Sequence, residues 1–255
     1  MKHYLHIVGI LFCMVSYIHA EPVRIMLLGD SITYDDAYID HSSLGGNTPR
    51  PASLRNGYRN DLWYMLNDAG YGVDFVGSRV AGSAIVPPFD TDNEGYPGET
   101  SNDIANKVYS KLVENPADII LLYIGANDWS DSVSGINRIL NNIDYYERDY
   151  HHHIKVFLAR IVNRQTYQPW MSHLNTNIQS LSNQRIANGD DIVVVEMEYG
   201  AGINYNTDFQ DRTHPNDMGY NKIAKAWFNT LKNFLTLTSS NDFSWLIPVN
   251  YLLLD

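Results

Sequence analysis

The chain has 255 residues, of which 44% are hydrophobic and 18% are charged, and its formal net charge at pH 7 is −11. This composition is typical of a folded globular protein and excludes an intrinsically disordered chain. Because an acidic surface repels phosphate groups at long range, the charge also disfavours nucleic acids and anionic membranes as partners. Neutral substrates remain open.

The first twenty residues have the layout of a secretory signal peptide. A basic start is followed by a mostly apolar run over 4–18, and the small residue Ala20 stands at the expected cleavage site. The run is shorter than the roughly 20 residues of a spanning helix, which disfavours a stable membrane span. A first core strand or an anchoring helix is the alternative. We expect 1–20 to be removed together with the single cysteine, Cys13, and the mature protein to be secreted or periplasmic.

Apolar, β-rich segments alternate with amphipathic helical patterns along the rest of the chain. The expected strands cover residues 23–28, 73–76, 119–124, 156–161 and 192–195. The expected helices cover residues 58–69, 104–112, 136–143, 170–181 and 220–234. Strands that are apolar throughout, each followed by an amphipathic helix, predict a parallel sheet covered on both faces. The expected fold is a three-layer α/β/α sandwich with about five parallel strands.

We expect one folded domain over residues 21–235. Within it, the polar stretch 34–53 is long for a loop and indicates a functional segment or a lid-like insertion. A polar linker and an apolar segment, 243–254, make up a C-terminal tail over 236–255. The tail either packs on the domain or serves in sorting or partner binding.

Polar clusters stand at four places where strands pass to loops or loops to helices. They cover residues 29–33, 95–100, 125–128 and 211–215. Ligands of open parallel sheets bind at the carboxyl ends of the strands, so the four clusters are expected at one edge. Each cluster alone is more often a turn or a helix cap. Together, in an otherwise apolar framework, they indicate a catalytic site.

The side chains of these clusters are those that ester hydrolysis requires. Ser31 is the expected nucleophile and His214 the expected general base, since imidazole exchanges protons near neutral pH. Asp211 would accept a hydrogen bond from the other ring nitrogen. The backbone N–H groups of Ser31 and Gly98 and the side-chain amide of Asn127 are the expected donors of an oxyanion hole.

Other interpretations of the polar residues are weaker. No histidine spacing typical of zinc sites occurs, and neither a cofactor nor a catalytic metal is expected. The three histidines at 151–153 are most simply a solvated turn, with adventitious metal binding as the alternative. Asp35, Asp36 and Asp40 share a loop that is suited to Ca²⁺, although a solvated loop is the simpler interpretation. A Gly-x-Ser-x-Gly elbow and a glycine-rich phosphate loop are both missing from the first cluster.

The four clusters resemble the conserved blocks of the SGNH, or GDSL-type, hydrolases. Ser31, Gly98, Asn127 and His214 match the residues that define the blocks, and Asp211 matches the aspartate three positions before the histidine. The resemblance spans residue 23 to about residue 235. Within these hydrolases, the sequence most resembles the family-three carbohydrate esterases, which include acetyl xylan esterases. The similar segments are residues 25–33, 57–59, 74–78, 93–98 and 213–216.

This resemblance implies a secreted serine esterase that hydrolyses short-chain acetyl esters of a small molecule or a polysaccharide. Two departures, Arg212 in place of the usual glycine and the insertion at 34–53, bear on the substrate rather than on the mechanism. A lipase-like or thioesterase-like hydrolase of longer acyl esters is one alternative. A catalytically silent polysaccharide-binding module on the same fold is another.

Overall fold

The computed structural model describes residues 21–36 and 50–237. Its centre is a seven-stranded sheet in the order β3-β4-β1-β5-β6-β7, in which β2 also pairs with β1. The strands are β1 (Val23–Gly29), β2 (Val73–Val76), β3 (Arg79–Val80), β4 (Asp92–Gly95), β5 (Ile119–Tyr123), β6 (Lys155–Arg160) and β7 (Ile192–Glu196). All pairs are parallel except β3 with β4. The five predicted strands are present, and β3 and β4 are additional.

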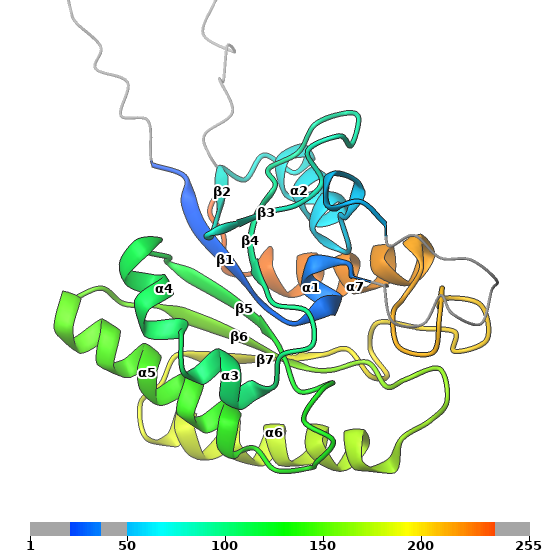
Figure 1. Ribbon diagram of the computed structural model, residues 1–255. Helices are drawn as coiled ribbons and strands as arrows, with labels where there is room; N and C mark the ends of the chain where they lie inside the picture. The colour runs from blue at the N-terminus through cyan, green and yellow to red at the C-terminus, as the bar shows by residue number, and fades with distance from the viewer. Residues whose placement is uncertain (1–20, 37–49, 238–255) are drawn as a thin grey trace, which may run out of the picture.

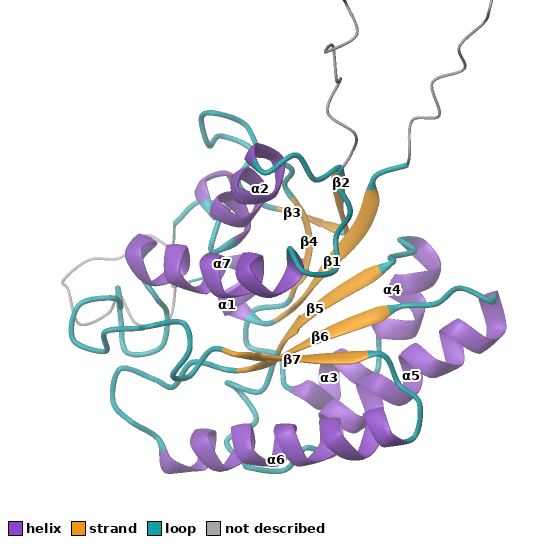
Figure 2. Ribbon diagram, turned by 180° about the vertical axis from the view of Figure 1, so that it is seen from behind, coloured by secondary structure: helices purple, strands orange, loops and turns teal. Residues whose placement is uncertain are grey.

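Helices cover both faces of this sheet (Figures 1 and 2). They are α1 (Ser31–Tyr34), α2 (Arg59–Asp68), α3 (Ser101–Ala105), α4 (Val108–Glu114), α5 (Ser134–Tyr150), α6 (Pro169–Ala187) and α7 (Asp217–Leu231), with a short 3₁₀ helix, Ala52–Leu54. Helices α2 and α7 pack together on one face, and α3 to α6 lie on the other. The three-layer α/β/α sandwich is therefore confirmed.

The helix expected over 104–112 is two helices in the structure. A capping box, in which Thr100 and Asp103 bond reciprocally, starts α3 early at Ser101. The helix then ends at Asn106, whose side chain accepts a hydrogen bond from Arg138 at 2.7 Å. Asparagine side chains favour helix ends over helix interiors, so α4 begins anew after the break.

The topology brings the predicted clusters to one edge of the sheet. From β1 the chain first adds β2 on one side and later adds β5 on the other. In open sheets with such a reversal of direction, ligands bind at the carboxyl ends of the two central strands. Ser31 follows β1 and Asn127 follows β5, so both lie at this edge of the sheet.

A fully buried arginine fixes the end of α1. The Arg59 guanidinium donates to the backbone carbonyls of Thr33 at 2.9 Å, Arg55 at 2.8 Å and Ala81 at 3.1 Å. Burial lowers the pKa of Arg59 to about 10. These bonds join α2 to the turn that carries Ser31, so the motif residue Arg59 supports the site from behind.

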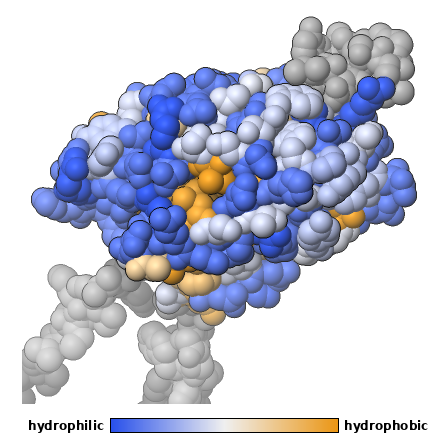
Figure 3. Space-filling model, turned by 90° about the horizontal axis from the view of Figure 1, so that it is seen from below, coloured by the Kyte–Doolittle hydropathy of each residue, from blue (hydrophilic) through white to orange (hydrophobic). Residues whose placement is uncertain are grey.

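The described ends of the chain lie at the opposite edge of the sheet. Glu21 precedes β1, and Leu237 forms an isolated bridge with Tyr71, just before β2. The predictions for 1–20, for most of the 34–53 stretch and for the tail beyond 237 fall outside the described residues and stay predictions. Seen from below, the surface is mainly hydrophilic, with an apolar patch near its centre and smaller apolar spots elsewhere (Figure 3). Among the described helices, none is both long and apolar enough to cross a bilayer.

Candidate active site

Ser31, His214 and Asp211 form a continuous chain of hydrogen bonds. Nε2 of His214 lies 2.9 Å from Oγ of Ser31, and Nδ1 of the same ring lies 2.9 Å from Oδ2 of Asp211. Ser31 is 8% exposed and His214 is 3% exposed. The structure thus brings together a hydroxyl, an imidazole and a carboxylate that the sequence separates by up to 183 positions. Such a chain supports transfer of a proton from the hydroxyl to the ring.

The turn that presents Ser31 is tightly built. A Cβ on Gly29 would lie 2.3 Å from the carbonyl oxygen of Tyr123, so only glycine fits where β1 ends. Asp30 then caps α1 by accepting a hydrogen bond from the Ile32 N–H at 2.9 Å. Burial raises the pKa of Asp30 to about 6, opposed by the bond from Ile32 and by His214 and reinforced by the nearby Asp128. Ser31 is therefore held in place by its neighbours on both sides.

Asp211 is held in its ionised form by its neighbours. Its Oδ1 accepts hydrogen bonds from the backbone N–H groups of Thr213 at 2.8 Å and His214 at 2.6 Å. Burial by itself would raise the pKa of Asp211, but these bonds and the bond from the His214 ring outweigh it and hold the pKa below its usual range. The carboxylate is thus fixed in orientation before any substrate arrives.

Gly98 occupies the third position of a type II turn. The Glu99 N–H donates to the carbonyl of Tyr96 at 3.2 Å, Pro97 stands second, and Gly98 has φ 77°. No heavy atom lies within 4 Å of the position that a Cβ would take. The backbone conformation, rather than a lack of space, therefore requires glycine here.

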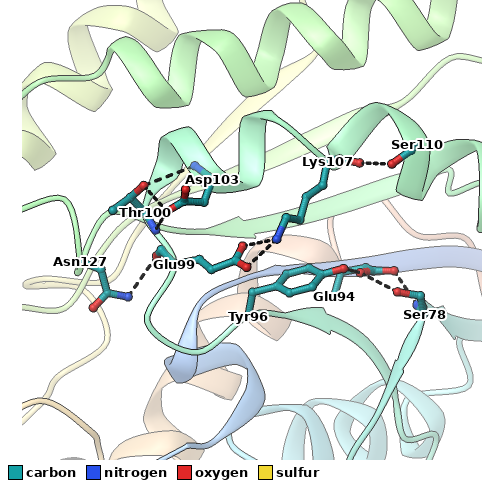
Figure 4. A network of polar contacts seen from close by, with 9 residues as sticks. All are labelled: Ser78, Glu94, Tyr96, Glu99, Thr100, Asp103, Lys107, Ser110 and Asn127. Carbon is teal, nitrogen blue, oxygen red and sulfur yellow. Dashed lines mark hydrogen bonds and ion pairs between the residues drawn. The ribbon is translucent and has the colours of Figure 1, made fainter.

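A polar network joins the Gly98 turn to Asn127 (Figure 4). Nδ2 of Asn127 donates to the carbonyl of Glu99 at 3.1 Å, and the Glu99 carboxylate pairs with Lys107 at 2.5 Å. The ammonium group of Lys107 also lies 4.3 Å from the centre of the Tyr96 ring. The bond to the Glu99 carbonyl orients the Asn127 side chain. Because the amide nitrogen carries two hydrogens, the second one can still donate a hydrogen bond to an oxyanion.

Comparison with known proteins decides the family. The family model described as GDSL-like Lipase/Acylhydrolase matches residues 25–227. The chain belongs to this family. The Ser31, Asp211 and His214 site described above lies within the matched residues.

The chain is similar to several esterases. A multidomain esterase of Ruminococcus flavefaciens is 28% identical over an alignment of 241 residues, which covers 85% of this chain and 29% of that protein. The chain thus spans less than a third of the length of this curated relative. A family 3 carbohydrate esterase of Clostridium thermocellum is 26% identical with a TM-score of 0.67, over 84% of this chain and 97% of that one. A family 3 carbohydrate esterase from Talaromyces cellulolyticus shares the fold at 24% identity and a TM-score of 0.67, over 83% and 97% of the two chains.

Arg164 and Asp128 support the site, although the sequence predicts no role for either of them. The Arg164 guanidinium donates to the carbonyl of Ala126 at 3.0 Å and to Oγ1 of Thr213 at 3.1 Å. It thereby joins the loop of Asn127 to the loop of His214. Asp128 accepts hydrogen bonds from the N–H and the hydroxyl of Ser101 at 2.7 and 2.6 Å. Asp128 lies within a predicted cluster, whereas Arg164 carries no local signal.

The described carboxylates suggested for Ca²⁺ have cationic partners in the structure. Asp35 pairs with Arg50 at 2.7 Å and Asp36 with Arg55 at 3.2 Å, whereas Asp40 lies outside the described residues. The described part of the chain gathers no group of three or more side chains suited to a metal. The histidines at 151–153 follow α5 and precede β6, at the edge of the sheet opposite Ser31.

Proposed function

We propose that this GDSL esterase is a secreted enzyme that removes acetyl groups from a neutral polysaccharide such as xylan. The observation that carries a serine mechanism is the hydrogen-bonded chain from Ser31 through His214 to Asp211. The substrate class is supported by the similarity to family 3 carbohydrate esterases and by the layout of a signal peptide over 1–20.

The proposed reaction begins with attack of Oγ of Ser31 on the ester carbonyl. His214 takes the hydroxyl proton at Nε2, and Asp211 stabilises the imidazolium that forms. When the tetrahedral intermediate collapses, the ring gives this proton to the departing sugar hydroxyl. Water then attacks the acetyl-enzyme with the same ring as base, which releases acetate and restores Ser31.

Three donors would stabilise the oxyanion of the intermediate. They are the backbone N–H groups of Ser31 and Gly98 and the second amide hydrogen of Asn127, which come from three separate loops. The network of Glu99 and Lys107 fixes two of these loops relative to each other. Donors fixed in advance cost little reorganisation as charge develops in the transition state.

We expect Asn127→Ala to lower kcat by roughly 10²–10³, because removal of one oxyanion donor has that effect in other hydrolases. Binding should suffer much less, since the donor meets a charge that forms in the transition state. Steady-state kinetics on an acetyl ester measures both. The matched control is Asn142→Ala, which removes an amide bonded to a backbone carbonyl of α3 at 2.7 Å. A change confined to KM would contradict the oxyanion role.

The acyl specificity is tested with a series of acetyl, butyryl and octanoyl esters beside acetylated xylan. A groove for long chains gains about 0.8 kcal/mol per buried methylene and should favour octanoyl esters. The low exposure of Ser31, 8%, favours a small acyl group instead. We expect kcat/KM to fall from acetyl to octanoyl and acetate to be released from xylan. A preference for octanoyl esters without acetate release would establish the lipase-like alternative.

A further inference from the structure

Trp129 is a large exposed side chain beside the site. It stands two residues after Asn127, at the carboxyl end of β5, and it is 65% exposed. Its φ of 48° lies in the left-handed region, which bulky residues rarely adopt. Unfavourable backbone conformations of this kind gather at functional sites, where the surroundings enforce them. Its exposure and its backbone both indicate a side chain that serves a ligand.

The indole ring is held in place by the residues around the catalytic loops. The Arg164 guanidinium lies 4.3 Å from the centre of the Trp129 ring, and the ring of Trp170 lies 5.9 Å away at a tilt of 38°. Arg164 is itself bonded to Thr213, the neighbour of His214. The ring is therefore fixed relative to the general base through a single side chain. A ring already fixed loses little conformational freedom when a ligand binds.

The chemistry of the ring decides what it binds. An exposed indole offers a flat, apolar and electron-rich face, which suits the C–H face of a pyranose ring. A flexible acyl chain gains most in an enclosed groove, because its binding scales with the surface removed from water. We propose that Trp129 stacks against a sugar ring of the substrate chain and so selects saccharide esters over simple esters. This inference rests on the proposed function.

Further exposed aromatic residues follow the next strands along the same edge. Tyr167 lies in the segment after β6 and Tyr199 in the segment after β7. Because parallel strands deliver the segments that follow them to one edge of the sheet, both tyrosines belong to the same edge as Trp129. An extended saccharide whose successive sugar rings contact successive aromatic side chains fits this arrangement.

The test compares two substrates in one set of variants. The substrates are an acetylated xylo-oligosaccharide and 4-nitrophenyl acetate, which has no sugar ring. We expect Trp129→Ala to lower the ratio of kcat/KM for the saccharide to kcat/KM for the simple ester about tenfold, mainly through KM. Trp129→Phe keeps a flat ring and should restore most of the ratio. The matched control is Tyr145→Ala, because Tyr145 is an exposed ring on α5 that also stacks with an arginine, Arg148, at 5.0 Å.

Equal losses with both substrates would overturn the inference, since Trp129 would then support the Asn127 loop rather than bind sugar. An unchanged ratio, or a selective loss with octanoyl esters, would overturn it as well. Calorimetry separates this failure from failure of the proposed function. Unacetylated xylo-oligosaccharide should bind to the Ser31→Ala variant and bind about tenfold more weakly to the double variant with Trp129→Ala. Saccharide binding without acetate release by the wild type would contradict the proposed reaction and would still support the stacking role of Trp129.

Discussion

Ser31→Ala is expected to lower kcat for ester hydrolysis by roughly 10⁴-fold or more, because loss of the nucleophile in a triad has effects of that size. The substitution removes the oxygen that attacks the carbonyl, which is the hydroxyl oxygen 2.9 Å from Nε2 of His214. Kinetics on an acetyl ester at substrate saturation measures the loss. A variant that keeps more than about a tenth of the wild-type rate would show that Ser31 is not the nucleophile.

The fold should survive this substitution. The cap of α1 depends on the Asp30 carboxylate rather than on the Ser31 hydroxyl, so the free energy of unfolding should change by about 1 kcal/mol, the contribution of one hydrogen bond. Thermal unfolding checks this. Ser182→Ala is the matched control, since it removes a buried serine hydroxyl that bonds within α6. Mass spectrometry adds a second measurement, because an organophosphate should modify the wild type at Ser31 and leave the alanine variant unmodified.

Strands β1, β2, β5, β6 and β7 could be predicted because strands that are buried on both faces are largely apolar. β4 escaped prediction because its residues, Asp92–Gly95, are polar. The Asn93 side chain accepts a hydrogen bond from the Gly95 N–H, and Glu94 accepts one from the Ser78 N–H. Hydrogen bonds within β4 and to the neighbouring loop thus satisfy the polar side chains of this strand. Hydrophobic periodicity contains no trace of such bonds.

The meeting of the proposed catalytic side chains at one edge of the sheet could be predicted because parallel strands deliver their following loops to one edge. Ser31, Asn127, Asp211 and His214 each sit in a cluster of polar residues at such a position. The residues that hold them could not be found in the same way. Arg164 bonds to Thr213 across 49 positions, and this contact exists through the packing of three loops. Local sequence signals report the ends of elements, whereas long-range contacts of this kind depend on the finished fold.

Asp211→Asn is expected to lower kcat by roughly 10³–10⁴, the effect of the same substitution in a serine protease triad. The structure gives the reason. Oδ1 of Asp211 is engaged by the N–H groups of Thr213 and His214, so the asparagine must place its oxygen there and its NH₂ group toward the ring. A donor facing Nδ1 forces the proton of the neutral ring onto Nε2. The ring then donates to Ser31 and no longer accepts its proton.

The pH dependence separates the two partners of the ring. Because the pKa of Asp211 is held below its usual range, the carboxylate stays ionised as the pH falls, and its contribution to stability is lost at still lower pH. The loss of wild-type activity on the acid side should therefore not come from protonation of Asp211, because Asp30, whose pKa is raised to about 6, loses its charge at higher pH than Asp211 does. The matched control is Asp208→Asn, because that buried aspartate pairs with Lys222 at 2.6 Å rather than with the histidine. It should lower thermal stability and leave kcat within a few-fold of the wild type. An unchanged rate in Asp211→Asn would make Asp211 a cap for the backbone of the His214 turn, which its two bonds to Oδ1 would then fully explain.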